Sequence, residues 1–154
     1  MLDDAAFRNA LHAKLLRAAH SSPGNLVVDE FGIDHGRRRA DVAVLNGRMT
    51  GYETKSDMDS LDRIRGQIGG YSKVFDYATV VVTDRHLRRV MSIVPTWWGV
   101  VGVSAGARRG IHFRTVRRGL PNPRSSAIAP ARLLWRREAT AILKELVSRK
   151  RHSA

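Results

Sequence analysis

The sequence predicts an α/β domain with a mixed central β-sheet flanked by helices. Amphipathic helical patterns alternate with short strand-like runs, in the order helix, three strands, helix, strand, helix, strand. At 154 residues with 43% hydrophobic content, the chain is long enough to fold around a core of its own. We therefore expect a single domain over residues 1–154.

Two amphipathic patterns predict helices over 3–19 and near 59–75. The apolar stripe of the first consists of Phe7, Leu11 and Leu15. The apolar stripe of the second consists of Leu61, Ile64, Ile68, Tyr71 and Phe75. Asp57 or Asp59 is expected to cap the second helix at its N-terminus.

The glycine pair Gly69-Gly70 lies inside the second predicted helix, where each glycine costs about 1 kcal/mol of helix stability. Either the close approach of a strand or ligand, or local weakness, would explain the pair. A short helix is expected over 85–94. The C-terminal segment, 119–154, reads as a Pro/Ser loop, a last amphipathic helix and a basic tail.

Alternating or β-branched apolar runs predict the strands. A hairpin is expected around Asn46-Gly47, a strong turn signal. The run "YATVVVTD" is typical of a strand that is buried on both faces. The expected strands cover 25–31, 40–45, 49–55, 77–84, 98–105 and 110–118.

The charge of the chain indicates a polyanionic partner. Twenty-seven Lys and Arg residues oppose fourteen Asp and Glu residues, giving a net charge of +13. Such an excess favours nucleic-acid binding, although a GC-rich genome would also enrich arginine. The positive charge is clustered in Arg37-Arg38-Arg39, Arg108-Arg109, Arg117-Arg118, Arg136-Arg137 and Arg149-Lys150-Arg151.

The predicted hairpin carries three charged residues inside its strands, namely Asp41, Glu53 and Lys55. Side chains alternate between the faces of a strand, so the length of the turn decides which of them meet. A two-residue loop would put Asp41 on the opposite face from Glu53. We predict instead the three-residue loop Leu45-Asn46-Gly47 with Gly47 in the left-handed conformation, or a bulge at Gly51, because an isolated charge in a central strand is costly.

Placed together, two carboxylates and an ammonium group have an evident chemistry. Mg²⁺ is usually bound through one or two carboxylates together with water and phosphate oxygens. An ammonium group beside the metal can hold an attacking water or neutralise charge on a phosphate. Asp41 and Glu53 are therefore candidate ligands of Mg²⁺ or Mn²⁺, and Lys55 is a candidate catalytic residue in phosphodiester hydrolysis.

These residues resemble the signature of the PD-(D/E)XK nuclease superfamily. Asp41 and "Glu53-Thr54-Lys55" match its Asp and E-x-K motifs in order and on predicted strands. "Gln67-Ile-Gly-Gly-Tyr71" matches the Q-x-x-x-Y of some branches, including the RecB-like nucleases. Ala40 stands where many members have proline. The likeness is to small bacterial predicted-nuclease proteins and covers about residues 25–103.

The resemblance implies a restriction-endonuclease-like αβββαβ fold with its catalytic core at 25–103, and a metal-dependent nuclease that acts on nucleic acid, DNA in the first instance. It adds Glu30, or its neighbour Asp29, and the Thr54 carbonyl as further metal contacts, and Gln67 and Tyr71 as residues that support the site or touch substrate. The cluster Arg37-Arg38-Arg39 would contact the phosphate backbone. Many such nucleases are dimers, so a homodimer is also considered.

The sequence is also compatible with other functions. A non-catalytic nucleic-acid-binding module on the same fold, or a protein–protein module, would share the basic charge. The motif Gly102-Val-Ser104-Ala-Gly106 matches a hydrolase nucleophile elbow, but a strand-like segment follows it where a helix is required. Trp97-Trp98 is expected to pack in a core or an interface.

Several classes of protein are disfavoured. The six histidines show no metal-ligand spacing, and cysteine is absent, so a zinc site is not expected. The sequence contains no long apolar stretch and no signal-peptide pattern. A cytoplasmic location is the default expectation.

Overall fold

The computed structural model of the chain describes residues 4–34, 36–106 and 110–124. Its helices are α1 (Asp4–Ala10), the π-helical turn η1 (Leu11–Leu15), α2 (Arg17–Ser21), α3 (Ile64–Val74) and α4 (Asp84–Ile93). Its strands are β1 (Leu26–Ile33), β2 (Arg38–Leu45), β3 (Met49–Lys55), β4 (Tyr77–Thr83), β5 (Gly99–Ala105) and β6 (Ile111–Arg117). The predicted last helix and basic tail fall on 125–154, outside the described residues.

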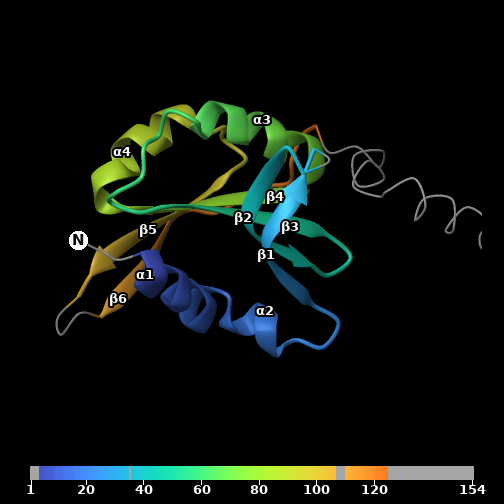
Figure 1. Ribbon diagram of the computed structural model, residues 1–154, viewed down its shortest axis with the longest axis horizontal. Coiled ribbons are helices and arrows are strands. Elements are labelled where there is room, and N and C mark those ends of the chain that lie inside the picture. Colours follow the sequence, from blue (N-terminus) through green and yellow to red (C-terminus); the bar gives the residue numbers. More distant parts are fainter. Residues whose placement is uncertain (1–3, 35, 107–109, 125–154) are drawn as a thin grey trace, which may run out of the picture.

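The strands form one six-stranded sheet in the order β1-β2-β3-β4-β5-β6. The pairs β3–β4 and β4–β5 are parallel and the others are antiparallel. Parallel neighbours need crossover connections, and α3 and α4 supply them. Figure 1 shows α3 and α4 on one face of the sheet and α1 and α2 on the other. The expected mixed α/β architecture is confirmed.

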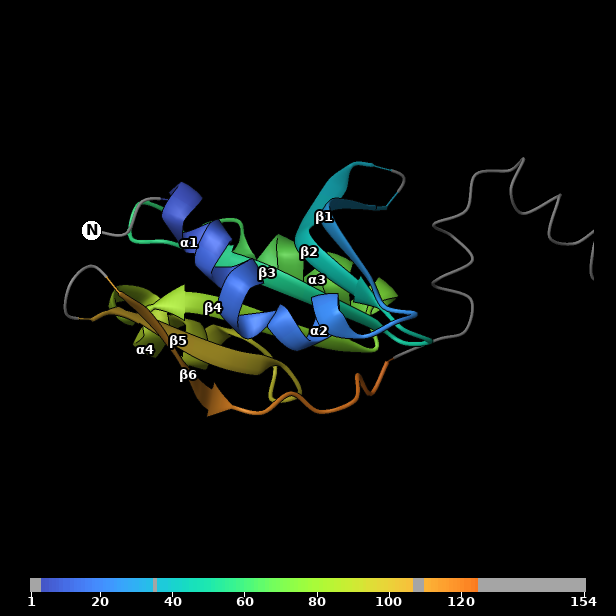
Figure 2. The same ribbon diagram turned by 90° about the horizontal axis from the view of Figure 1, so that it is seen from below.

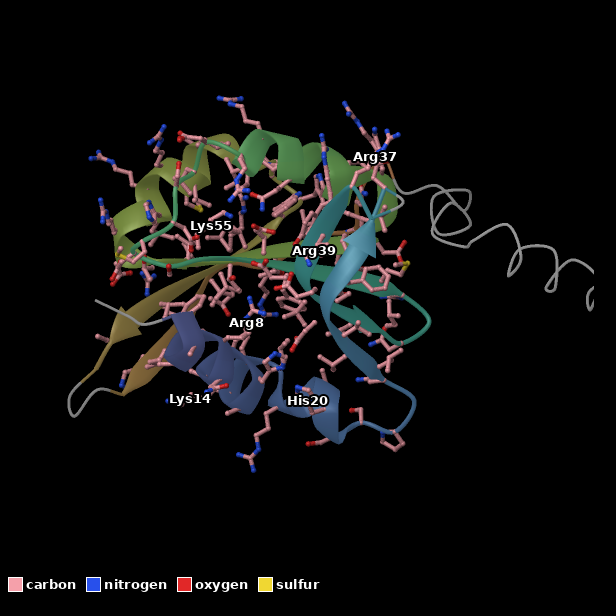
Figure 3. The ribbon with its side chains drawn as sticks, in the orientation of Figure 1. Arg8, Lys14, His20, Arg37, Arg39 and Lys55 are labelled. Atoms are coloured by element: carbon pink, nitrogen blue, oxygen red, sulfur yellow. The ribbon has the colours of Figure 1, made fainter. Side chains whose placement is uncertain are left out.

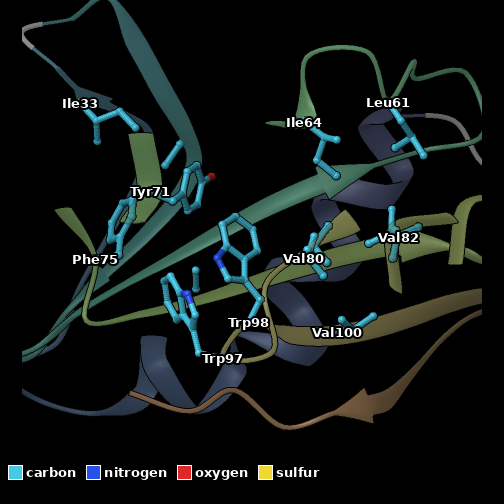
Figure 4. Packing of buried hydrophobic residues seen from close by; sticks show 14 of the residues in the cluster. Ile33, Leu61, Ile64, Tyr71, Phe75, Val80, Val82, Trp97, Trp98 and Val100 are labelled. Atoms are coloured by element: carbon cyan, nitrogen blue, oxygen red, sulfur yellow. The ribbon is translucent and has the colours of Figure 1, made fainter. Parts of the chain in front are cut away.

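The sheet has a separate core on each face. The cluster under α3 and α4 includes Tyr71, Phe75, Val80, Val82 and Trp98, which gather closely in Figure 4. The cluster under α1 and α2 includes Phe7, Leu11, Leu16, Val42 and Val81. Because β4 contributes to both clusters, its predicted burial on both faces is confirmed. Trp97 and Trp98 are both buried, as expected.

The predicted continuous helix over 3–19 is interrupted by a π-helical turn. The Leu16 amide donates to the Leu11 carbonyl at 2.9 Å, a five-residue step. Phe7, Leu11 and Leu16 are buried, whereas Leu15, which a regular helix would bury, is only partly so. The extra residue in the turn lets the C-terminal half of this segment keep its apolar contact with the sheet.

The second predicted helix begins later than expected, at Ile64. Asp59 does not cap it, because the Asp59 carboxylate accepts the Ser56 amide at 2.7 Å and closes a turn after β3. Ser60 then accepts the Asp62 amide at 3.1 Å. Such local side-chain bonds compete with the helix for backbone donors. The segment between Lys55 and Ile64 is therefore an ordered loop beside the end of β3.

The β2–β3 hairpin confirms the predicted register parity and corrects the turn by one residue. Leu45 pairs with Met49, so the loop is Asn46–Arg48, one position later than expected. Gly47 has φ +81°, the predicted left-handed conformation. Leu45 stays in the ladder because its partner Met49 is also held by a second contact. The Met49 amide donates to the Asp76 carboxylate at 2.8 Å.

The nucleophile elbow considered at Ser104 is not formed. β5 ends at Ala105, and the next described segment is β6, which pairs antiparallel with β5 through Ser104 and His112. A nucleophile elbow requires a strand-to-helix turn. Ser104 is an exposed residue of a β-hairpin strand.

Candidate functional site

The C-terminal end of β3 holds a buried ion pair. Glu53 is 1% exposed and Lys55 is 7% exposed. The Lys55 Nζ lies 2.6 Å from the Glu53 Oε1 and donates to it. Both side chains point to the α3 side of the sheet, where the neighbouring core is apolar. An ion pair in that position is largely desolvated, and contacts with protein groups replace its hydration.

Helix α3 supplies two further donors to Glu53. The Gln67 Nε2 donates to Oε1, and the Tyr71 hydroxyl lies 2.9 Å from Oε2 and 3.0 Å from the Tyr52 carbonyl. Gln67 and Tyr71 are one turn apart on the helix, as predicted. The structure therefore brings Glu53, Lys55, Gln67 and Tyr71 together in one hydrogen-bonded cluster.

Gly51 permits this approach of α3 to β3. A Cβ atom at Gly51 would lie 2.7 Å from the Phe75 ring and 2.8 Å from the Tyr71 ring. Gly70 has a similar role where α3 meets β1 and β2, since its Cβ would lie 3.2 Å from Ile33 and 3.3 Å from Arg38. Close approach by a strand thus explains one glycine of the pair in α3.

Burial raises the pKa of two groups in the cluster. Burial raises the pKa of the Glu53 carboxyl, and the charge of Asp41 raises it further, whereas Lys55 and Tyr71 act to lower it. Burial also raises the pKa of the Tyr71 hydroxyl well above its usual value. Tyr71 therefore remains a hydrogen-bond donor to the carboxylate. A cation near Glu53 would relieve its repulsion with Asp41.

Asp41 lies where β2 separates from β3. The ladder runs only as far as Val42 and Tyr52, and the Asp41 Oδ2 accepts the Thr54 amide at 2.7 Å and the Thr54 hydroxyl at 2.6 Å. In a regular strand, residues 40 and 43 would point to opposite faces of the sheet. Ala40 and Ala43 both belong to the core under α3, so the alternation of faces is broken between them. The Asp41 carboxylate turns toward Thr54 instead of standing beside Glu53 on one regular face.

Asp41 and Glu53 nevertheless line the same pocket. This inner pocket has a volume of about 180 Å³. Its lining also includes Arg8, Thr54, Lys55, Asp59, Arg63 and Gln67. The buried Gln67 Oε1 has no hydrogen-bond partner among the described residues and remains an acceptor there. Asp41 and Glu53 thus share a pocket that has room for water and ligand groups.

Two cations at the inner pocket, Arg8 and Arg63, were not predicted as site residues. Arg8 reaches it from α1, and Figure 3 shows this residue between α1 and the sheet. Its position depends on how α1 packs against the sheet, for which the sequence holds no signal. Arg63 lies one helical turn before Gln67, and that spacing could have identified it.

Glu30, the predicted additional metal ligand, is held by arginines. Its carboxylate lies 3.0 Å from Arg8 and 3.6 Å from Arg39. Its backbone is left-handed, with φ +50°, and the pairing of β1 with β2 skips this position. The ion pair with Glu30 raises the pKa of Arg8. Within 4–34, 36–106 and 110–124, no three acidic, His or Cys side chains form a metal-binding group.

The predicted arginine cluster lines a second, larger pocket of about 800 Å³. Arg37 is exposed there, and Arg39 is exposed beside Glu30. The Arg38 guanidinium donates to the Gly66 carbonyl of α3 at 2.6 Å, so it also braces the hairpin against the helix. All three arginines reach the pocket, as does Asp41.

The donor set fits a hard divalent cation bound through two carboxylates. Mg²⁺ commonly takes one or two carboxylates and completes its shell with water and phosphate oxygens. Both hydrogen bonds to Asp41 end on Oδ2, so Oδ1 is available within the described residues. Glu53 would have to share oxygens that Lys55 and Tyr71 already contact. Glu30 would have to leave its arginine partners to become a third ligand.

No helix among the described residues is long and apolar enough to cross a membrane. Beyond that, the chain resembles known proteins in sequence and in fold. A protein of unknown function from Silicibacter pomeroyi superposes with a TM-score of 0.52 at 22% identity, over 88% of this chain and 83% of that one, and so has a similar fold. The SfsA protein of Pyrococcus furiosus, solved with Ca²⁺, covers 75% of this chain and 62% of its own at 17% identity. Its TM-score of 0.41 carries no inference.

The sequence comparisons lead to a phage protein. Protein cII of Enterobacteria phage P4 is 30% identical over 93 residues, or 60% of this chain. Those residues make up 35% of that protein, so the chain spans about a third of the length of this curated relative. The family described as bacteriophage P4 protein cII matches residues 2–154. The chain therefore belongs to the bacteriophage P4 protein cII family.

Proposed function

We propose that this protein is a divalent-metal-dependent nuclease that hydrolyses phosphodiester bonds, with DNA as the first substrate to test. The observation that carries the proposal is the buried Glu53–Lys55 pair, which opens with Asp41 into one pocket beside an arginine-lined groove. A metal-binding carboxylate pair, an ammonium group and a phosphate-binding surface are the components that this reaction requires.

The ion pair is poorly explained by stability alone. Removing two charges from water costs several kcal/mol per ion, and a well-packed apolar pair of similar volume is often as stable or more so. The parallel neighbour β4 has Val80 and Val82 at the matching positions. Perturbed carboxyl groups in a pocket are more frequent at functional sites. A chemical role for Glu53 and Lys55 is therefore favoured.

Each residue has a distinct role in the proposed reaction. Asp41 and Glu53 would hold the cation, and the Thr54 carbonyl is a further contact suggested by the resemblance to the PD-(D/E)XK nucleases. When bound, that cation supplies Lewis-acid activation of water and neutralises charge on the phosphate. Lys55 would orient the attacking water through its ammonium group. Gln67 and Tyr71 would act as positioning residues, because their contacts fix the Glu53 carboxylate.

A cleavage assay tests the proposal. Wild type, Glu53→Ala and Lys55→Ala would be incubated with plasmid, linear duplex, branched DNA, single-stranded DNA and RNA, each with Mg²⁺, Mn²⁺ or EDTA. We expect cleavage by the wild type that requires metal and falls by ~10²-fold or more in both variants. Arg88→Ala, an exposed cation on α4, serves as a control that should cleave normally.

One observation favours a second candidate, a non-catalytic nucleic-acid-binding module. Both oxygens of Glu53 are already bonded by side chains of this chain, which would suit a purely structural cluster. Such a module would bind nucleic acid equally well in EDTA and would not cleave any of the substrates. It would also retain its binding when Glu53 is replaced by glutamine.

A further inference from the structure

The inner pocket and the larger arginine-lined pocket form one continuous groove. Asp41, Arg63 and Gln67 line both of them. We call the whole the arginine groove. One wall is the β1–β2 hairpin, which projects from the body of the molecule in Figure 2, and the other is the start of α3. The groove ends at the buried pair Glu53 and Lys55.

Cations from separate elements face this groove. Arg37 and Arg39 line it from the hairpin, Arg63 from the segment before α3, and Arg8 from α1 at the inner end. Acidic residues line it too, namely Glu30, Asp41, Glu53, Asp59 and Asp62. Glu30 is paired with Arg8 and Arg39, and the Arg38 guanidinium is held by the Gly66 carbonyl. Arg37 and Arg63 remain, with no ion pair among the described residues. These two are the cations most available to incoming phosphates.

The dimensions of the groove limit what can enter it. The outer pocket, at about 800 Å³, has the size of a small-ligand cleft, typically ~300–1,000 Å³. The inner pocket is smaller, at about 180 Å³, and lies between residues of α1 and α3. Glu53 and Lys55, at its base, are almost fully buried. A buried site behind so small a pocket suits one extended strand better than an intact duplex, which is much wider than a single strand.

We propose that the arginine groove binds single-stranded nucleic acid and admits duplex only where its strands have separated. This inference rests on the proposed function and deepens it by specifying the form of its substrate. Arg37 and Arg63 contact successive phosphates along the groove, and the scissile phosphate lies in the inner pocket near Lys55. The aromatic residue among those lining the groove, Phe7, is buried, so binding follows the backbone and does not read bases.

Fluorescence anisotropy in EDTA tests the proposal without requiring cleavage. The probes are a labelled single-stranded DNA oligonucleotide, the same sequence as blunt duplex, and the RNA version. We expect the single strands to bind at least ~10-fold more tightly than the duplex at matched salt. Each phosphate contact contributes ~0.7 to the slope of log affinity against log salt for single strands. Arg37→Ala and Arg63→Ala should each lower that slope by about this amount.

Arg88→Ala is the matched control, since it removes the same charge from an exposed position outside the groove. Equal or tighter binding of duplex would overturn the proposal, as would equal slope changes in Arg88→Ala and in the groove variants. Failure of the proposed function looks different. Binding of single strands through Arg37 and Arg63 without cleavage of any substrate would refute the nuclease and leave the groove inference standing. Cleavage confined to intact duplex would support the nuclease and refute the groove inference.

Discussion

Strands β3 and β4 lie side by side and parallel in the sheet, yet they place different chemistry on the same face. Glu53 pairs with Val80 and Lys55 pairs with Val82. All four side chains are buried, and the core around them is largely apolar. β4 fulfils the hydrophobic pattern of a central strand, whereas β3 departs from it at two positions where α3 supplies compensating hydrogen bonds. The departure marks the candidate site.

This contrast also shows what keeps the charges in place. Val80 and Val82 need only apolar neighbours, which stabilise them by ~1.5–3 kcal/mol each when fully buried. Glu53 needs three donors, from Lys55, Gln67 and Tyr71. Loss of one donor leaves a buried charge that is incompletely satisfied. The end of β3 should therefore be far more sensitive to conservative substitution than the end of β4.

The largest effect is expected from Lys55→Met, which keeps most of the unbranched side chain and removes its charge. Breaking a buried pair from one side typically costs ~3–5 kcal/mol because the other charge stays buried. Val82→Ala on β4 should cost less, about 2 kcal/mol, for the apolar groups that it removes. Urea unfolding of the two variants measures the difference. A Lys55→Met variant more stable than Val82→Ala would contradict the account.

The double variant Glu53→Leu/Lys55→Met sharpens the comparison by making β3 resemble β4. With no buried charge left, we expect its stability to return to within about 1 kcal/mol of wild type or to exceed it. The Tyr71 hydroxyl keeps the Tyr52 carbonyl as a partner, and Gln67 can turn to the pocket. If the double variant were as unstable as Lys55→Met, an unpaired buried charge could not be what destabilises Lys55→Met.

An effect smaller than that of Lys55→Met is expected from Gly51→Ala, which tests the close approach of α3 to β3. The new methyl group would overlap the rings of Phe75 and Tyr71 and force one of them to move. Overpacking of this kind costs ~1–3 kcal/mol. Thermal unfolding gives the loss. Gly47→Ala, in the exposed hairpin turn, is the comparison that strains the backbone without touching the site.

Tyr71→Phe removes one hydroxyl and leaves the ring. We expect a loss of ~1–3 kcal/mol, since the Glu53 Oε2 loses its donor inside the protein. Urea unfolding of this variant measures the loss. If Tyr71 positions Glu53, cleavage should fall more than binding. Equal stability and unchanged cleavage in Tyr71→Phe would mean that the hydroxyl has no role in holding the carboxylate.

Among the single substitutions, the smallest change in stability is expected from Arg8→Ala. Arg8 and Glu30 form an exposed pair, and such pairs contribute ~0–1 kcal/mol. Its effect should instead appear in binding, because Arg8 lines the inner pocket. A stability loss above ~2 kcal/mol, beyond what an exposed pair contributes, would show that Arg8 is a structural brace of α1.

Much of this arrangement could be predicted from the sequence, because it depends on local patterns. Strand and helix periodicity predicted the element order, and Gly47 predicted the register parity of the β2–β3 hairpin. The errors arose where individual contacts, and not the periodicity of the sequence, decide the outcome. The π-helical turn follows from the fit of Leu16 against the sheet, and the late start of α3 follows from the bond between Asp59 and Ser56.

The candidate site shows the same division. The positions of Gln67 and Tyr71 beside Glu53 follow from one helix face meeting one strand, which the spacing could predict. The orientation of Glu30 could not be predicted, because it depends on Arg8 from α1 and on a left-handed backbone at a non-glycine residue. The turn of Asp41 toward Thr54 also required knowledge of where the β2–β3 ladder ends.

The most direct test of the central claim is metal-dependent cleavage by the folded double variant Glu53→Leu/Lys55→Met, measured beside wild type on single-stranded DNA. The account predicts that wild type cleaves with Mg²⁺ or Mn²⁺ and that the double variant, although at least comparably stable, does not. Cleavage by the double variant at the wild-type rate would show that the charged pair in β3 is not the catalytic site.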